Sequence, residues 1–286
     1  MPILESMAKV GVYADVANLF HNGGQRLQYD VLREFACRDG AEAVRLNAYV
    51  TFDTERAERD HNYRDGATSF HNKLRDYGYK VVTKEVTWFR DDAGNRIGKT
   101  NADLDLAVDV LLQSERLDRV LIASGDGDLI RVVRGLQNRG ARVEVLGLNE
   151  SAASLREEAD LFVPGFLVPD LVPIRRRGER RGDRRDEPAW GELGSRVRGW
   201  CYWFEAERGF GYIRFMKEVG PGLWLTDARH PESPYETAFL RAGALPRDVP
   251  PERLPNRNLI FELTLEESER RDGLQAADLE LVSSLE

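Results

Sequence analysis

The sequence predicts an α/β domain with a mainly parallel sheet and helices on both faces, followed by a small all-β barrel. Over the first half of the chain, short apolar runs alternate with helical stretches, as in parallel sheets whose strands are joined by helices. From residue 196 onward only short strand-like segments separated by turns remain, which is typical of a small barrel. We therefore expect a first domain at 8–170, a linker at 171–194 and a second domain at 195–286.

The elements of the first domain follow from hydrophobic periodicity and turn residues. Apolar or β-rich runs predict strands at 10–14, 43–50, 79–83, 119–123 and 141–147. Helical stretches lie at 30–38, 56–77, 102–114, 128–139 and 151–158. Alternating residues on both sides of an Asp-Asp-Ala-Gly-Asn turn signal predict a hairpin within 84–99. Since the helix at 102–114 is nearly apolar all round, we expect it to be buried against the sheet.

The charge and composition of the chain are those of a soluble globular protein. Its formal net charge is −8, so a polyanion would have to bind at local basic surfaces. Cys37 and Cys201 lie far apart, which argues against a disulfide framework and a thiolate metal site. The sequence has no secretory signal pattern and no apolar run near the ~20 residues that span a bilayer. We therefore expect a cytoplasmic protein that does not enter a membrane.

The composition changes sharply between the two domains. The segment 175–188 contains seven arginines. It predicts a solvated tether, and the alternative is an arm that also contacts phosphate. The two interpretations are compatible.

Polar side chains follow two apolar strands at the point where each strand ends. Asp15 directly follows the run VGVYA, and Asn18 comes three residues later. The segment SGDGDL follows the run RVLIA and contains Ser124, Asp126 and Asp128. Because the carboxyl ends of parallel strands meet at one edge of a sheet, we expect these residues to share a crevice.

A third acidic motif lies at the start of a helix. Asp103 begins the helix at 102–114, and its carboxylate is expected to point toward the strand ends. Carboxylate oxygens are ligands that Mg²⁺ and Mn²⁺ prefer, whereas the four histidines form no ligand-spaced pair for zinc. The sequence therefore predicts a magnesium or manganese site with ligands Asp15, Asp103, Asp126 and Asp128.

Helix capping is the alternative explanation for three of these acids. Asp103, Asp126 and Asp128 lie near predicted helix starts, where aspartate is a common cap. Capping explains Asp15 less well, because an acid directly after a buried strand exposes a charge at a crevice. For the other three, a capping role and a site role both stay open.

Further residues are expected to support the acids. Asp109 lies deep in an apolar helix, where an unpaired carboxylate is costly, so we expect it to orient Lys99 or a neighbouring backbone group. Lys99 and Arg131 are candidates for steadying phosphates, and Ser124 is a third supporting residue. Asp105 is expected to face elsewhere, because it lies two residues from Asp103 on a helix.

The order ADVAN, then K-x-x-x-D-x-x-x-x-x-D, then SGDGD resembles the NYN domain family, a branch of the PIN-like nucleases that includes the LabA-like proteins. The resemblance covers residue 8 to about residue 165. It implies a PIN-like (Rossmannoid) fold and a metal-dependent ribonuclease. The first motif departs from the family pattern, since Val16-Ala17 stand where a Gly-Asn or similar small pair is usual. The catalytic residues that it implies are Asp15, Asp103, Asp126 and Asp128, with Asn18 beside them.

The second domain interleaves aromatic and basic residues at strand spacing. In GWCYWFEAERGFGYIRF (199–215), Trp203, Phe210 and Tyr212 can share an exposed face. Nucleobases stack on such faces with little regard to sequence. The alternative is that these aromatic residues form the barrel core, and for any single one it is at least as plausible.

The segment WFEAERGFGYI (203–213) resembles the cold-shock domain pattern WF-x(3)-KGFGFI. The resemblance implies an OB-fold barrel that binds single-stranded RNA or DNA. Arg208 replaces the usual lysine and keeps its charge. The second aromatic strand is expected at 222–228, which contains Trp224, and Thr226 stands there in place of the usual histidine.

Together these features predict a metal-dependent ribonuclease whose barrel captures single-stranded RNA, with DNA as the alternative substrate. The main alternative is a non-catalytic RNA-binding adaptor with a nuclease-like domain. A haloacid-type phosphatase is disfavoured because the first strand lacks Asp-x-Asp, and a dinucleotide-binding oxidoreductase because no Gly-x-Gly-x-x-Gly follows that strand. The apolar segment 165–172 is expected to be covered either by a homodimer interface or by packing within the chain.

Overall fold

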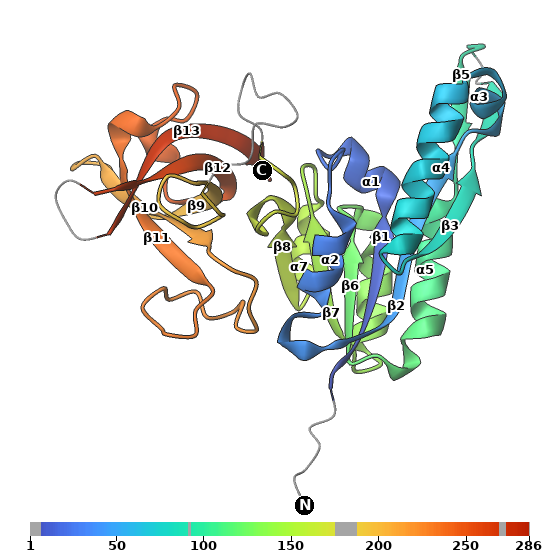
Figure 1. Cartoon of the computed structure of the whole chain (residues 1–286), viewed down its shortest axis with the longest axis horizontal. Coiled ribbons are helices and arrows are strands. Elements are labelled where there is room, and N and C mark those ends of the chain that lie inside the picture. The colour runs from blue at the N-terminus through green and yellow to red at the C-terminus, as the bar shows by residue number, and fades with distance from the viewer. Residues whose placement is uncertain (1–6, 91–92, 175–187, 269–272, 286) are drawn as a thin grey trace, which may run out of the picture. The chain divides into compact units, whose positions relative to one another are not determined.

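The computed structural model describes residues 7–90, 93–174, 188–268 and 273–285. The chain forms two compact units: Met1–Gln25 with Tyr29–Val163, and Arg26–Gln28 with Pro164–Glu286 (Figure 1). This division falls a few residues before the predicted domain boundary at 170. Of the predicted arginine-rich tether, residues 175–187 lie outside the described residues.

A six-stranded sheet in the order β3-β2-β1-β6-β7-β8 forms the centre of the first unit. The central strand β1 pairs in parallel with β2 and with β6, β2 pairs in parallel with β3, and β6 with β7. The predicted parallel sheet is therefore confirmed. The strand β8 was not predicted, because it is only four residues long and shows no alternation. The strands are β1 (Lys9–Asp15), β2 (Glu42–Phe52), β3 (Lys80–Glu85), β6 (Arg119–Ala123), β7 (Arg142–Gly147) and β8 (Leu161–Pro164).

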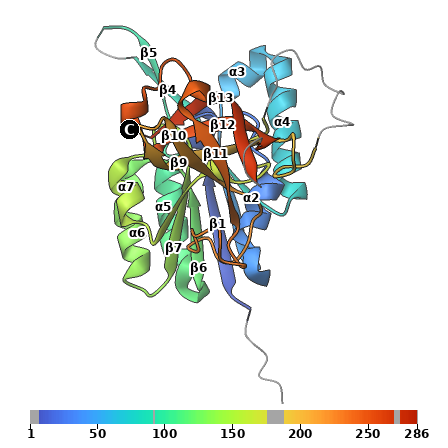
Figure 2. The ribbon, with the colours of Figure 1, turned by 90° about the vertical axis from the view of Figure 1, so that its left-hand side faces the viewer.

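Helices cover both faces of this sheet. Figure 2 shows α2 and α4 on one face and α5, α6 and α7 on the other. The predicted helix at 56–77 is two helices, since the backbone of Asp60 leaves the helical conformation and its side chain caps α4 by accepting from the N–H of Tyr63. The helices are α1 (Val16–His21), α2 (Tyr29–Ala36), α3 (Thr54–Arg59), α4 (His61–Asp76), α5 (Ala102–Gln113), α6 (Ile130–Gln137) and α7 (Ala153–Glu158).

One face of α5 packs into the core, and the other faces solvent. Leu106 and Val110 are fully buried against the sheet. Leu104, Val108 and Leu112, which follow one another at four-residue spacing, are 58%, 47% and 74% exposed. The prediction that α5 is buried against the sheet is therefore confirmed for one face only, because a helix on the outer layer of an α/β sheet has only one face to bury.

The predicted hairpin is confirmed as a separate two-stranded sheet of β4 (Thr87–Arg90) and β5 (Arg96–Lys99). Phe89 lies opposite Ile97 in the register, and both are exposed. The guanidinium of Arg96 lies over the ring of Trp88 at 4.2 Å. Arg96 also forms an ion pair with Glu55 on α3, which attaches the hairpin to that helix.

Five strands of the second unit close into a barrel in the order β10-β11-β13-β12-β9. All pairings are antiparallel except that of β11 with β13. The predicted all-β second domain is confirmed, but its second aromatic strand is not at 222–228, where the structure has turns. That place in the sheet is taken by β11, which pairs with β10. The strands are β9 (Arg196–Glu205), β10 (Phe210–Met216), β11 (Tyr235–Arg241), β12 (Asn256–Glu267) and β13 (Leu274–Ser284).

The apolar segment 165–172 packs within the chain. Phe166, Leu167 and Leu171 are buried. Arg198 of β9 donates to the carbonyl oxygen of Val172 at 2.6 Å and lies over the ring of Phe166 at 5.4 Å. This segment therefore leaves no apolar surface that requires a dimer, and a homodimer stays a prediction.

None of the helices in the described part of the chain is long and apolar enough to span a bilayer. Cys37 and Cys201 are both free thiols, as expected from their separation in the sequence. A cytoplasmic location stays a prediction.

Candidate functional sites

The carboxyl ends of β1 and β6 meet at one edge of the sheet. The two strands pair in parallel, with Ala14 opposite Ala123. From this pair the sheet continues to β2 on one side and to β7 on the other. Such a reversal of strand order leaves a crevice at the carboxyl ends, which is where open α/β sheets bind ligands. Asp15 is the last residue of β1, and Ser124 directly follows β6.

Asp15 is a buried acid, only 7% exposed, at this edge. Its Oδ1 accepts a hydrogen bond from the backbone N–H of Asn18 at 3.0 Å, and its Oδ2 lies 3.4 Å from the hydroxyl of Ser124. Burial raises the pKa of Asp15; these two hydrogen bonds oppose the shift, and the charges of Asp126 and Asp103 add to it. Three carboxylates from distant parts of the sequence are thus electrostatically coupled. We call Asp15, Asp103 and Asp126 the acidic edge.

Asn18 and Ser124 connect the two strand ends. The side-chain oxygen of Asn18 accepts from the backbone N–H of Gly125 at 2.9 Å, and the hydroxyl of Ser124 accepts from the backbone N–H of Asp126 at 3.2 Å. The predicted proximity of these residues is present in the structure. Sequence reasoning missed Ser151: a Cβ atom on Gly125 would lie 2.8 Å from the Ser151 hydroxyl oxygen. Glycine is therefore required where the loops after β6 and β7 meet.

The SGDGD motif uses its two acids differently. The Oδ1 of Asp126 accepts from the backbone N–H of Asp128 at 2.9 Å, so Asp126 caps the short helix Gly127–Leu129. The capping explanation is thus correct for Asp126, which is also coupled to Asp15. The carboxylate of Asp128 is exposed, and only its backbone N–H contributes to these contacts.

Asp103 lies in the first turn of α5 with an exposed side chain. The cap position of this helix is Asn101, which makes no side-chain capping bond. Asp103 influences the pKa of Asp15 through its charge. Asp105 forms an ion pair with Lys84 at 2.5 Å and faces elsewhere, as expected.

Asp109 has a partner that was not predicted. The hydroxyl of Tyr49 on β2 donates to Asp109 at 3.0 Å, and the side-chain amide of Asn47 donates to that hydroxyl at 3.0 Å. The expected partners were Lys99 or a backbone group, and the structure adds Tyr49 as a partner. The sequence shows that a carboxylate in an apolar helix needs a partner, but not which strand supplies it. The side chain of Lys99 lies outside the described residues.

The chemistry of the acidic edge fits a hard divalent cation. Its three carboxylates supply oxygen ligands, and a cation among them would oppose the burial and the charge repulsion that raise the pKa of Asp15. In the part of the chain that the structure describes, no three histidine, cysteine, aspartate or glutamate side chains already lie close enough to hold an ion. The predicted cage of Asp15, Asp103, Asp126 and Asp128 is therefore not preformed, because Asp103 and Asp128 face solvent.

Comparison with known protein families assigns the part of the chain that carries the acidic edge. The NYN domain model matches residues 9–168, which is more than half of the chain. The chain belongs to the NYN domain family. This family is a PIN-like nuclease family, and its match confirms the resemblance seen in the three acidic motifs.

Two individual proteins are similar to part of this chain. The Low amplitude and bright protein LabA of Synechococcus elongatus is 28% identical over 175 residues, which cover 59% of this chain and 86% of that protein. A solved structure of a protein of unknown function from Vibrio parahaemolyticus is 25% identical with a TM-score of 0.44. The similarity covers 56% of this chain and 93% of that chain.

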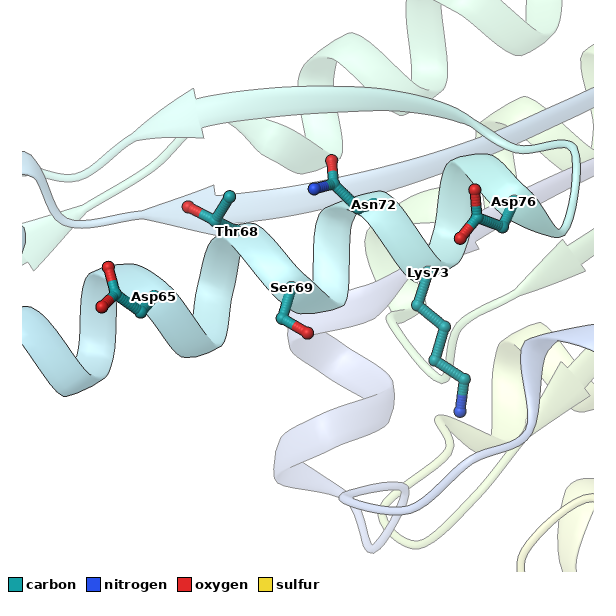
Figure 3. Close-up of a pocket in the computed structure, with 6 residues that line it drawn as sticks. All are labelled: Asp65, Thr68, Ser69, Asn72, Lys73 and Asp76. Atoms are coloured by element: carbon teal, nitrogen blue, oxygen red, sulfur yellow. The ribbon is translucent and has the colours of Figure 1, made fainter.

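Surface pockets of the NYN domain lie apart from the acidic edge. Figure 3 shows a polar pocket whose lining side chains all project from α4. A second pocket lies at the C-terminal end of α5 and includes Leu112 and Arg139. Neither contains a predicted catalytic residue, so neither is a candidate for the reaction. The residues of the α4 pocket are Asp65, Thr68, Ser69, Asn72, Lys73 and Asp76.

Four aromatic side chains form one continuous surface on the barrel that follows the NYN domain. Trp203 lies 5.4 Å from Phe210 and 5.9 Å from Tyr212 between ring centroids, and Phe239 lies 5.8 Å from each of Phe210 and Tyr212. None of the four belongs to the buried core of the barrel. The alternative that the predicted aromatic residues form the core is therefore wrong. We call Trp203, Phe210, Tyr212 and Phe239 the aromatic face.

Two other predicted nucleic-acid contacts are not among the four rings of the aromatic face. Arg208 is exposed in the turn between β9 and β10. Trp224 is 64% exposed in the irregular segment before β11 and makes no ring contact with the aromatic face. Phe239 of β11 takes the place that the sequence assigned to this segment.

Proposed function

We propose that this chain is a metal-dependent nuclease that hydrolyses phosphodiester bonds of single-stranded RNA. The observation that carries the proposal is the electrostatic coupling of Asp15, Asp103 and Asp126 at the β1/β6 crevice of an NYN domain. A carboxyl group whose pKa is raised, lying with other acids in such a crevice, is typical of a catalytic site.

The acidic edge would hold Mg²⁺ or Mn²⁺. When bound, the ion would polarise the phosphodiester and make a bound water more acidic. Asn18 and Ser124 hold the segments after β1 and β6 in position through their hydrogen bonds to the backbone N–H groups of Gly125 and Asp126. Burial keeps Asp15 away from bulk water, which strengthens its attraction for a cation.

The barrel would capture the substrate. A closed five-stranded barrel with an exposed aromatic face is consistent with an OB-fold of cold-shock type. Successive bases would stack on Trp203, Phe210, Tyr212 and Phe239. A covalently joined binding module raises the local concentration of substrate at the acidic edge. RNA is proposed over DNA from the family resemblance.

The test is incubation of end-labelled single-stranded RNA and DNA with the full chain in Mg²⁺, in Mn²⁺ and in a chelator. We expect metal-dependent cleavage of RNA that the chelator abolishes. The Asp126→Asn variant should lose at least 100-fold in turnover and keep its affinity for RNA, since asparagine can still accept the capping hydrogen bond from Asp128. Equal cleavage by Asp126→Asn and the wild type would contradict the site assignment. Tight RNA binding without cleavage in any metal would instead support a non-catalytic adaptor.

A further inference from the structure

A largely buried arginine without an ion pair among the described residues lies at one end of the aromatic face. Arg214 alternates along β10 with Ile213 and Phe215, whose side chains enter the barrel core, so it is on the same outer side as Phe210 and Tyr212. It is only 9% exposed. Within the described residues, Arg214 forms no hydrogen bond and no ion pair.

Aromatic rings hold this guanidinium in place. Its carbon lies 4.1 Å from the ring of Tyr202 and 6.0 Å from the ring of Trp200, its register partner on β9. Tyr202 in turn contacts Tyr212 of the aromatic face, with 6.4 Å between ring centroids. The stacked arginine therefore continues the row of rings along the barrel.

The hydrogen-bond donors around Arg214 lack acceptors. Its Nε and the indole Nε1 of Trp200 are both buried without a partner. The terminal nitrogens of Arg214 make no hydrogen bond within the described residues. They differ from the buried Nε in being at least partly exposed to solvent. A fixed guanidinium with open terminal nitrogens presents the planar pair of donors that suits a phosphate.

The surrounding charges leave this position positive. Arg257 lies close enough for its charge to repel that of Arg214. The nearby carboxylate of Asp227 is already bound by Arg229, at 2.9 Å and 2.7 Å. The charge of Asp227 attracts Arg214 but forms no ion pair with it. A largely buried positive charge without an ion pair destabilises the fold, and the barrel retains one here although the whole chain carries a net charge of −8.

We propose that Arg214, stacked on Tyr202, binds a backbone phosphate of a single nucleic-acid strand whose bases lie on the aromatic face. The proposal rests on the proposed function of the barrel and adds a fixed phosphate position to it. A phosphodiester fits because it is anionic and because the strand that stacks on Tyr212 carries phosphates past the adjacent Tyr202. Arg257 adds long-range attraction for the same strand.

The experiment measures binding of the full chain to a labelled single-stranded RNA in chelator over a series of salt concentrations. The Arg214→Met variant replaces the charge with an apolar chain of similar length. We expect its affinity to fall at least fivefold and the slope of log K against log salt to become shallower by about 0.7, the value for one lost phosphate contact on a single strand. The control is Arg247→Gln, an exposed arginine of the same unit that takes no part in these contacts; it should change neither quantity.

Two further measurements separate binding from folding. Removing a buried, unpaired charge should leave the melting temperature of Arg214→Met unchanged or higher, whereas a fall would mark Arg214 as structural and overturn the proposal. A scan of singly methylphosphonate-substituted RNAs should reveal one position that weakens wild-type binding and does not weaken Arg214→Met further. If the wild type binds RNA and Arg214→Met binds equally well, only this inference fails. If the wild type does not bind RNA, the proposed function of the barrel fails as well.

Discussion

The side-chain oxygen of Asn18 accepts a hydrogen bond from the backbone N–H of Gly125 at 2.9 Å, across 107 residues of sequence. The bond joins the first turn after β1 to the loop after β6. The same loop carries Asp126, so a single side chain connects two of the segments that form the acidic edge.

Replacing Asn18 by alanine should remove this connection. We expect at least a tenfold loss of nuclease turnover and a fall of about 1–2 kcal/mol in the free energy of unfolding, because a partly buried N–H loses its acceptor. Turnover assays and urea unfolding measure the two effects. Asn62→Ala, on the exposed side of α4, is the control and should alter neither. Full activity of Asn18→Ala would show that the loops hold their position without the bond.

Replacing Asp15 by asparagine should abolish cleavage and stabilise the folded chain at neutral pH. The largest cause is burial, which raises the pKa of Asp15 above its ordinary 3.8. The folded chain therefore binds this proton more tightly than the unfolded chain. The stability that protonation of Asp15 contributes to the folded chain is fully present below pH 3.8 and is lost as the pH rises through the raised pKa.

The pH dependence of the free energy of unfolding tests whether the charge of Asp15 destabilises the folded chain. Asp15→Asn should exceed the wild type in unfolding free energy at pH 7, and the difference should shrink as the pH falls toward 4. Asparagine can still accept the hydrogen bond from Asn18 that caps α1, so the comparison isolates the charge. Added Mn²⁺ should raise the melting temperature of the wild type and not that of the variant. A variant that is less stable at pH 7 would show that the charge of Asp15 is compensated in the fold.

Replacing Phe239 by alanine should weaken binding of single-stranded RNA. The ring of Phe239 contacts both Phe210 and Tyr212, and loss of one stacking ring costs about 1–3 kcal/mol, or roughly 5- to 150-fold in affinity. Trp224→Ala is the matched control, since this exposed ring lies off the aromatic face. Fluorescence anisotropy with labelled RNA gives both affinities. A larger loss from Trp224 than from Phe239 would place the strand elsewhere on the barrel.

Replacing Tyr49 by phenylalanine should destabilise the NYN domain by about 1–3 kcal/mol, because Asp109 then loses its hydroxyl donor and Asn47 an acceptor. Urea unfolding measures the loss. Tyr77→Phe is the control, since its hydroxyl bonds no described residue. An unchanged midpoint for Tyr49→Phe would mean that water replaces the hydroxyl at Asp109.

The sequence alone was sufficient for the layout of the NYN domain. Parallel strands that are buried on both faces appear as short apolar runs, so β1, β6 and β7 were predictable from composition. The strands β2 and β3 are less buried and were predictable as β-rich runs. The acids of the edge were predictable as well, because Asp15 and the SGDGD motif come directly after such runs. The strand β8 and the division between α3 and α4 were missed, since each depends on a few residues without periodicity.

What the sequence by itself determined was the order of elements, the family and the residue types available at the strand ends. Only the tertiary structure decided which of them meet: Tyr49 donates to Asp109, Phe239 rather than Trp224 lies on the aromatic face, and Arg214 lies at the end of that face without an ion pair among the described residues. The physical reason is that propensity and periodicity act along the chain, whereas these contacts depend on strand pairing between distant segments. Which side chain faces which partner follows from register, and register is set by packing of the whole sheet.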